Sequence, residues 1–243
     1  MLNINSTIEN SIESPFQSPI KHPYNIPFNI KLLKKNDTHR NTVEQFIKQG
    51  YQHAFNANIY QFMPLLLTLY KGKKQAALGI RTCKKSSSFA TSPLFVEQYI
   101  QAPIEQQGVL KSENIKRHHI VEIGNLHSNS KLLTLQLFLL TAVALYVSRY
   151  KYMVFAGTEQ VLNIHQSIGI KLHHICMAKQ SNLLEGADNW GSYYQTAPQV
   201  VAVNLQQVME VITQSDKYQN LFEQLMVQIA ELGIQLKAQG ECL

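Results

Sequence analysis

The sequence predicts an α+β domain that ends in a helical tail. Strand-like apolar runs and helical segments follow one another without an internal repeat, which favours a single mixed domain. Beyond residue 205, apolar residues recur at helical spacing. The chain has 243 residues, 45% of them apolar, and can therefore bury a core of its own. We expect a leader over 1–30, a folded domain over 31–205 and a helical tail over 206–243.

The leader, residues 1–30, combines four prolines with many Ser and Asn residues and shows no helical or strand periodicity. This composition predicts an extended or disordered segment. The leader has neither the basic start nor the apolar stretch of a secretory signal. Three cysteines without metal-like or redox spacing indicate no disulfide framework. We therefore expect a cytoplasmic protein.

The first half of the domain reads as one helix followed by a hairpin. Asp37 or Asn41 is expected to cap a helix whose core stripe is Val43, Phe46, Ile47, Tyr51, Ala54 and Phe55. The runs 64–70 and 76–82 flank a Gly turn and predict two antiparallel strands. A polar loop over 84–92 follows. Pro103 suits the first turn of a helix that ends near Gly108.

The second half alternates strands and helices. Strands are expected over 119–126, 152–156, 171–176 and 200–203, and a helix that includes Val161, Leu162, His165 and Ile168 is expected to stop at Gly169. Ser128 or Ser130 would cap an apolar helix over 131–149. Its uncharged run of 16 residues is shorter than the roughly 20 that span a bilayer, and it contains Gln136. We expect a buried core helix and no transmembrane span.

Net charge bears on the class of partner. The chain carries 22 Lys and Arg against 16 Asp and Glu, a diffuse excess that favours an anionic substrate or an acidic carrier protein and does not indicate nucleic acid. The run Lys111, Lys116, Arg117, His118 and His119 is either a docking site for such a carrier or a solvated loop. Neighbouring His pairs, 118–119 and 173–174, would point to opposite faces of a strand, so we expect no metal site.

Four motifs carry a resemblance to known proteins. These are Leu78-Gly79-Ile80-Arg81, the segment 94–105, Val121-Glu122-Ile123-Gly124-Asn125-Leu126, and Trp190-Gly191-Ser192-Tyr193-Tyr194. In this order they resemble the bacterial thermostable hemolysin family, over roughly 40–205. The order of elements also resembles the Gcn5-related N-acetyltransferases, which implies an acetyltransferase-like fold: a mixed, mostly antiparallel central sheet flanked by helices. The family is named for red-cell lysis, yet its fold is similar to acyl-homoserine-lactone synthases, which move a fatty acyl group from acyl carrier protein to an amine.

Acyl transfer to an amine needs a base, and Glu122 and Glu97 are the catalytic candidates. On the implied fold both would lie on neighbouring central strands, where apolar neighbours raise the pKa of a carboxylate. The alternative is that each is a structural carboxylate paired with Arg81 or an amide. Gly124-Asn125 either marks a bulge whose amides bind a carbonyl oxygen or is an ordinary strand end.

The candidate substrate-binding residues are Arg81, Tyr99, Asn125, Asp188, Trp190, Tyr193 and Tyr194. The last four bring aromatic rings and a carboxylate into one loop, which suits a pocket wall or, alternatively, a clamp on the core. Acetyltransferases open the helix after the central strand with a Gly-rich loop for coenzyme A. Here 127–131 contains no glycine. No tightly bound cofactor is expected, and acyl carrier protein and acyl-CoA both stay open as donors.

Three functions remain open from the sequence. The first is an acyltransferase that acts on a small amine. The second is a membrane-active hemolysin in which the 132–147 segment or the tail enters lipid. The third is an inactive binding module that uses the same pocket. The tail would pack either on its own domain or on a second copy in a homodimer, since an amphipathic stripe does not specify its partner.

Overall fold

The computed structural model describes residues 28–83 and 93–241. Most of the expected leader and the expected polar loop over 84–92 lie outside this part of the chain. The elements follow in the order β1 (Asn29–Leu33), α1 (Arg40–Phe55), β2 (Leu65–Lys71), β3 (Lys74–Thr82), α2 (Val96–Ile100), α3 (Gly108–Ser112), β4 (Ile120–Ser128), α4 (Lys131–Val147), β5 (Tyr152–Gly157), α5 (Glu159–Gln166), β6 (His173–Met177), β7 (Gln199–Asn204), α6 (Leu205–Thr213) and α7 (Asp216–Glu241). Short 3₁₀ helices are η1 (Ile104–Gln106), η2 (Arg117–His119), η3 (Gln180–Asn182), η4 (Ala187–Trp190) and η5 (Tyr193–Thr196).

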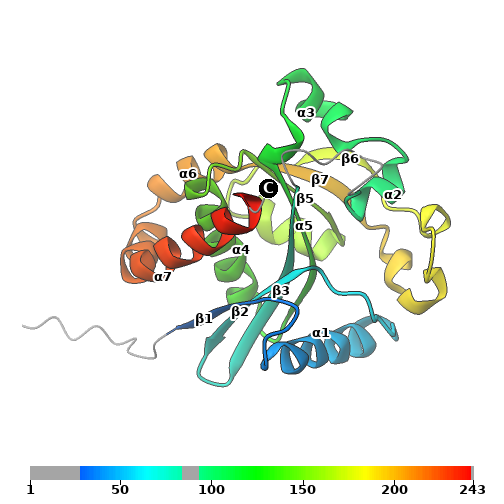
Figure 1. The fold of residues 1–243 in the computed structure, drawn as a ribbon, viewed down its shortest axis with the longest axis horizontal. Coiled ribbons are helices and arrows are strands. Elements are labelled where there is room, and N and C mark those ends of the chain that lie inside the picture. The colour runs from blue at the N-terminus through cyan, green and yellow to red at the C-terminus, as the bar shows by residue number, and fades with distance from the viewer. Residues whose placement is uncertain (1–27, 84–92, 242–243) are drawn as a thin grey trace, which may run out of the picture.

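One seven-stranded sheet, in the order β1-β2-β3-β4-β5-β7-β6, organises the molecule (Figure 1). Every neighbouring pair is antiparallel except β4 and β5, which are parallel. The predicted fold class, a mixed and mostly antiparallel sheet flanked by helices with a C-terminal helical tail, is confirmed. The predicted hairpin is also confirmed, as β2 and β3. β1 begins at Asn29, so the ordered sheet starts two residues before the expected boundary at 31.

Two helical layers cover opposite faces of the sheet. α1 packs with Leu66 and Ala77 on one face, whereas α4 packs with Leu65, Leu67 and Leu78 on the other. Alternate residues of a strand point to opposite faces, which is why neighbouring leucines of β2 serve different layers. The predicted helix over 40–55 is confirmed, but its N-cap residue is His39 rather than Asp37 or Asn41. Asp37 instead accepts a hydrogen bond from the Lys34 amide in the preceding turn.

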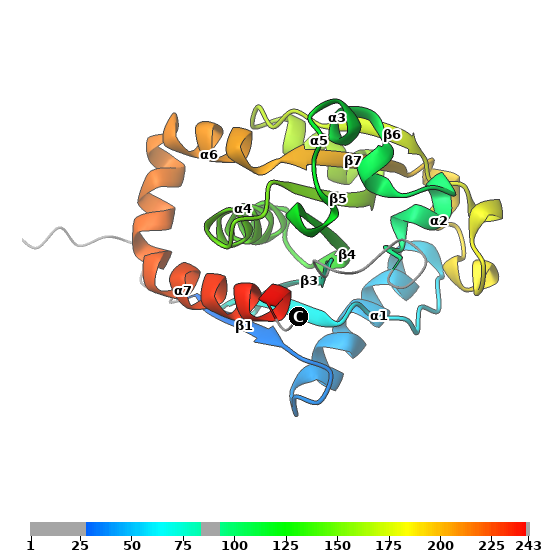
Figure 2. The same cartoon turned by 45° about the horizontal axis from the view of Figure 1, so that its top comes forward.

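The apolar helix α4 is a core helix, as predicted. It lies between the sheet on one side and α6 and α7 on the other (Figure 2), so nearly its whole circumference is buried. Ser130 is its N-cap and accepts from the amide of Leu133. None of the helices in residues 28–83 and 93–241 is both long and apolar enough to cross a membrane.

The tail folds back on its own domain. Phe222, Leu225, Ile229 and Leu232 of α7 join the core cluster around α4, and the Ser148 hydroxyl donates to the carbonyl of Gly233. Met226, which the apolar stripe was expected to include, is 61% exposed. It lies one residue beyond Leu225, about 100° around the helix, and so leaves the packed face.

Candidate functional site

The parallel strands β4 and β5 separate in the middle of the sheet. Their pairing covers Ile120–Tyr152, Val121–Met153 and Glu122–Val154. β4 then continues to Ser128 and β5 to Gly157 without a further pair between them. A cavity opens where the two strands diverge, and Glu122 lies at the last paired position.

A β-bulge lies in β4 three residues after Glu122. Ala77 pairs with His127 and Gly79 with Gly124, so Leu78 alone lies opposite Asn125 and Leu126. Asn125 takes a left-handed backbone conformation with φ of 48°. Of the two alternatives for Gly124-Asn125, a bulge or an ordinary strand end, the structure has the bulge. A bulge bends its strand and leaves an extra residue outside the ladder, which helps β4 turn away from β5.

The Asn125 side chain holds the connection between α1 and β2. Its Oδ1 accepts from the Met63 amide at 2.9 Å, and its Nδ2 donates to the Gln61 carbonyl at 3.2 Å. Met63 in turn lies against Gly79 and Gly124, where a Cβ atom would meet it at 2.7 and 2.6 Å. Asn125 lines the cavity, but its side-chain amide is already used in positioning this wall.

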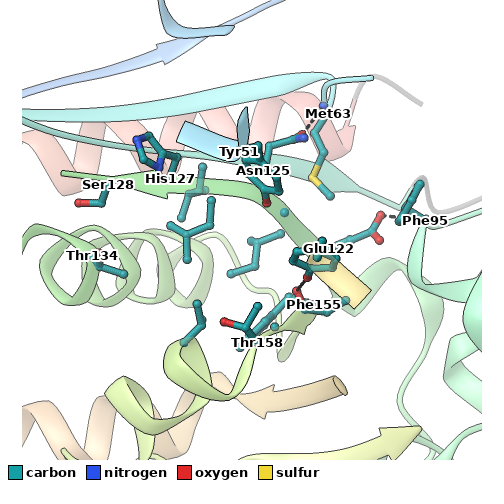
Figure 3. A pocket seen from close by; sticks show the side chains of 18 of the residues that line it. Tyr51, Met63, Phe95, Glu122, Asn125, His127, Ser128, Thr134, Phe155 and Thr158 are labelled. Carbon is teal, nitrogen blue, oxygen red and sulfur yellow. Dashed lines mark hydrogen bonds between the residues drawn. The ribbon is translucent and has the colours of Figure 1, made fainter. Parts of the chain in front are cut away.

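The cavity has a volume of about 330 Å³ and is lined from both faces of the sheet. Tyr51 and Phe55 of α1 lie on one side, and residues of α4 and α5, including Phe138 and His165, lie on the other. Figure 3 shows Ser128 and Thr134 at one end and Glu122 with Phe95 at the other. The space therefore passes through the sheet at the point where β4 and β5 diverge.

Glu122 is a buried carboxylate in the wall of this cavity, 1% exposed. Its Oε2 accepts from the Phe95 amide at 2.9 Å and its Oε1 from the Val96 amide at 2.7 Å. Arg81 Nη1 lies 3.7 Å from Oε2. Burial raises the pKa of Glu122, and the Arg81 charge and the two amides oppose that rise. A carboxylate has about four lone-pair sites, so two remain for a substrate or a water molecule.

Glu97 was expected on a central strand, and this is wrong: it lies on the short helix α2. Its Oε1 and Oε2 accept from Arg117 Nη1 and Nη2 at 2.6 and 2.9 Å. The carboxylate also accepts from the amides of Leu94 and Ile104. Glu97 does not line the cavity. Glu97 is therefore a structural carboxylate, the alternative stated for it, but its cationic partner is Arg117 and not Arg81.

Arg81 and Tyr99 both line the cavity beside Glu122. Arg81 is the cross-strand neighbour of Glu122 between β3 and β4, and its side chain is 30% exposed. Its Nη1 donates to the Pro93 carbonyl at 3.3 Å. Arg81 thus brings a cation to the mouth of the cavity.

The loop around Trp190 contributes aromatic rings to the wall of the cavity. Trp190 and Tyr193 line it, whereas the Tyr194 hydroxyl lies 2.7 Å from that of Tyr99 behind the wall. Asp188 is exposed and does not line the cavity. The loop is anchored on the end of α1, because the Ser192 amide donates to the Phe55 carbonyl at 2.8 Å. It is therefore both a clamp and a pocket wall.

The glycine-free segment 127–131 forms the polar end of the cavity, to which His127, Ser128 and Lys131 contribute. His127 fits over Gly50 of α1, where any Cβ atom would lie 2.2 Å from the imidazole. Its ring packs on Phe46 at a centroid distance of 4.7 Å, and burial lowers its pKa. A Gly-rich loop would line this end of the cavity with main-chain amides, whereas the segment 127–131 lines it with the side chains of His127, Ser128 and Lys131.

The basic run before β4 does not form one surface. Arg117 is 7% exposed and binds Glu97 and Glu105, so it is a core residue rather than part of a docking site. Lys111 and Lys116 are exposed, and the His118 and His119 rings pack on each other. Within the described part of the chain, no group of three or more His, Cys, Asp or Glu side chains is arranged to hold a metal ion.

Several cavity residues were not predicted from the sequence: Met63, Phe95, Phe138, Phe155 and His165. Four of them look like ordinary core residues in sequence. The sequence could have indicated His165 as a cavity residue, because it is a titratable residue four positions after Val161 in the apolar stripe of a helix.

Comparisons with known proteins agree with the motifs. Residues 33–209 match the family model described as thermostable hemolysin. Among solved structures, the chain is similar to FeeM, an N-acyl amino acid synthase from uncultured soil microbes, with 11% identity over 79% of this chain and 97% of that one and a TM-score of 0.48. It is also similar to the acyl-homoserine-lactone synthase LasI (9% identity, 74% and 90% covered, TM-score 0.41) and to the CoA-dependent synthase BjaI (12% identity, 76% and 87% covered, TM-score 0.43). Such distant likenesses carry no conclusion about the reaction. No match was found among curated protein sequences.

Proposed function

The chain belongs to the thermostable hemolysin family, and from this premise we propose that it is an acyltransferase that joins a fatty acyl group to an amine. The observation that carries the proposal is the position of Glu122. This buried carboxylate has a raised pKa and lies where two parallel strands separate around a largely apolar cavity. A carboxylate whose pKa is raised by burial, beside a space for an apolar chain, suits the proton removal that N-acyl transfer requires.

In the proposed reaction, the amine nitrogen attacks the carbonyl carbon of an acyl thioester. A C–N bond forms, the attacking nitrogen loses a proton to Glu122, and the C–S bond then breaks. The thiol leaves with a proton, which Glu122 can return, so that the carboxylate is regenerated. Arg81 at 3.7 Å would stabilise the ionised form of Glu122 before the proton is taken.

The developing oxyanion needs hydrogen-bond donors at the point of attack. We infer that main-chain amides of β4 beyond Glu122 supply them, because this edge of β4 has left β5 and the bulge at Asn125 displaces the chain from the ladder. The part of the cavity lined by Phe138, Phe155 and His165, the apolar arm, would take the acyl chain. The part lined by Trp190 and Tyr193, the aromatic arm, would take the amine. Entry from two faces of the sheet would let both substrates meet at Glu122.

The donor would reach the cavity from the end formed by Ser128, Lys131 and Thr134. Lys131 would pair with a phosphate of the pantetheine arm that both acyl-CoA and acyl carrier protein possess. The exposed Lys111 and Lys116 would support an acidic carrier protein by charge complementarity.

Mass spectrometry of lipid extracts tests the proposal. Cells that express the wild type are expected to contain an acylated amine that is missing from cells with Glu122→Gln, with both proteins shown to be folded by circular dichroism. Glutamine keeps the shape of the side chain and a hydrogen-bond acceptor for the Val96 amide, but it cannot take a proton. Identical extracts would contradict the proposal.

A second candidate function is direct action on membranes, and the outer surface of α7 favours it. Met226, Val227 and Ile234 are 61%, 69% and 71% exposed on this one helix. Purified wild type would then release dye from phosphatidylglycerol vesicles without any acyl donor, and replacement of these three residues by Glu would abolish release. Leu184→Glu, at an 84% exposed apolar residue outside α7, is the matched control. No release from the wild type would eliminate this function.

A further inference from the structure

The apolar arm of the cavity contains one polar ring. His165 of α5 lines the cavity together with Phe138, Phe155 and Val161, and it is 0% exposed. Its ring packs on Phe138 and Phe155 at centroid distances of 3.7 and 5.7 Å. An imidazole in such surroundings costs free energy unless both of its nitrogens have hydrogen-bond partners.

Only one of the two nitrogens has a partner among the described residues. Nδ1 lies 2.7 Å from the carbonyl oxygen of Val161, one turn earlier in α5. A carbonyl oxygen can only accept, so Nδ1 carries the proton. Nε2 is buried and has no hydrogen-bond partner in the described part of the chain.

The protonation state then fixes what Nε2 can bind. Burial lowers the pKa of His165 to about 4, so the ring is neutral at pH 7. With the proton on Nδ1, Nε2 has a lone pair and acts as an acceptor. It can bind a hydroxyl group but not a carbonyl oxygen, which is itself an acceptor.

We propose that His165 selects acyl chains that carry a hydroxyl group, which donates a hydrogen bond to Nε2 inside the apolar arm of the cavity. This inference rests on the proposed function and narrows its substrate class. A hydroxyacyl chain would satisfy the buried nitrogen, an unsubstituted chain would leave it unpaired, and a ketoacyl chain would bring two acceptors together. The expected order of affinity is hydroxyacyl, then unsubstituted, then ketoacyl.

Equilibrium binding tests the inference without catalysis. The probes are N-acetylcysteamine thioesters of decanoic acid, of its monohydroxy isomers and of the matching keto acids, titrated calorimetrically into the full-length protein without an amine. At least one hydroxy isomer is expected to bind the wild type about fivefold more tightly than the decanoyl thioester, as one net hydrogen bond provides. The keto compound of the same position is expected to bind less tightly than the decanoyl thioester.

Two variants test the role of the Nε2 acceptor. His165→Phe keeps an aromatic ring but lacks an acceptor, so the hydroxy isomer and the decanoyl thioester are expected to bind it about equally. His174→Phe makes the same exchange at an exposed histidine that does not line the cavity, so the preference is expected to survive. For wild-type protein labelled with ¹⁵N, the Nε2 resonance of His165 is expected to shift with the hydroxy isomer and not with the decanoyl thioester. This last measurement holds even if His165→Phe does not fold.

Equal binding of every hydroxy isomer and the decanoyl thioester would overturn the inference, as would a preference that persists in His165→Phe. Either result would leave the proposed function intact, because that function is tested separately, by whether the wild type forms an acylated amine that Glu122→Gln does not form. Conversely, a hydroxyl preference that depends on His165 would stand even if no transfer were found.

Discussion

Arg117 and Glu97 form a buried two-point ion pair, with Nη1 and Nη2 of the guanidinium 2.6 and 2.9 Å from the two carboxylate oxygens. This pair shows that the two carboxylates that the sequence offered as bases have different surroundings. The oxygens of Glu97 are occupied by Arg117 and by main-chain amides away from the cavity, whereas Glu122 faces the cavity with lone pairs to spare. The two residues should therefore respond differently to the same substitution.

Glu97→Gln is expected to destabilise the protein by about 3 kcal/mol, because it leaves the buried Arg117 charge without its main partner. Urea denaturation followed by circular dichroism measures the change in the free energy of unfolding. Glu44→Gln is the matched control, since the Arg40–Glu44 pair is partly exposed and its loss is expected to cost less than about 1 kcal/mol. Equal effects of the two substitutions would show that the Arg117 pair does not hold α2 in place.

Gly191→Ala is expected to displace the aromatic loop from the end of α1. Gly191 has φ of 50°, and a Cβ atom there would lie 2.1 Å from the Phe55 carbonyl oxygen. Trp190 is the single tryptophan of the chain, so its emission reports on the loop directly. A red shift of that emission is expected.

Gly72→Ala is the control for this substitution, because Gly72 has φ of 61° but open space around it. It carries the same backbone strain, about 1 to 2 kcal/mol, without the collision. Unchanged Trp190 emission in both variants would argue against the clamp.

His165 makes stability depend on pH in a known direction. Its pKa falls from 6.5 to about 4 on folding, so the unfolded chain binds more protons in this window. The contribution to stability is complete above pH 6.5 and is lost as the pH falls toward 4, by about 3 kcal/mol in total. The difference in unfolding free energy between wild type and His165→Phe is expected to fall by this amount over the window. A difference that does not change with pH would mean that folding does not lower the pKa of His165.

The pattern of apolar residues predicted most of the fold because these elements depend on local periodicity. The bulge was one of two alternatives for Gly124-Asn125, because the same two residues also suit an ordinary strand end. Sequence patterns did not predict the helix in the segment 95–100, because this conformation depends on hydrogen bonds from the Phe95 and Val96 amides to Glu122, 27 and 26 residues away. Arg117 was misread for the same reason: its partners are distant in sequence. The cavity depends on the divergence of β4 from β5, which no local pattern reports.

Thiol release by the purified protein would show whether Glu122 acts as the base in acyl transfer. The assay mixes an acyl carrier thioester with a panel of small amines and follows the free thiol with a chromogenic disulfide, for wild type, Glu122→Gln and the exposed-site control Glu159→Gln. Amine-dependent thiol release is expected from the wild type and from Glu159→Gln, and a rate at least about 100-fold lower from Glu122→Gln, as follows from loss of a general base. Release at the same rate from Glu122→Gln would contradict this expectation, because Glu122 would then play no part in taking the proton.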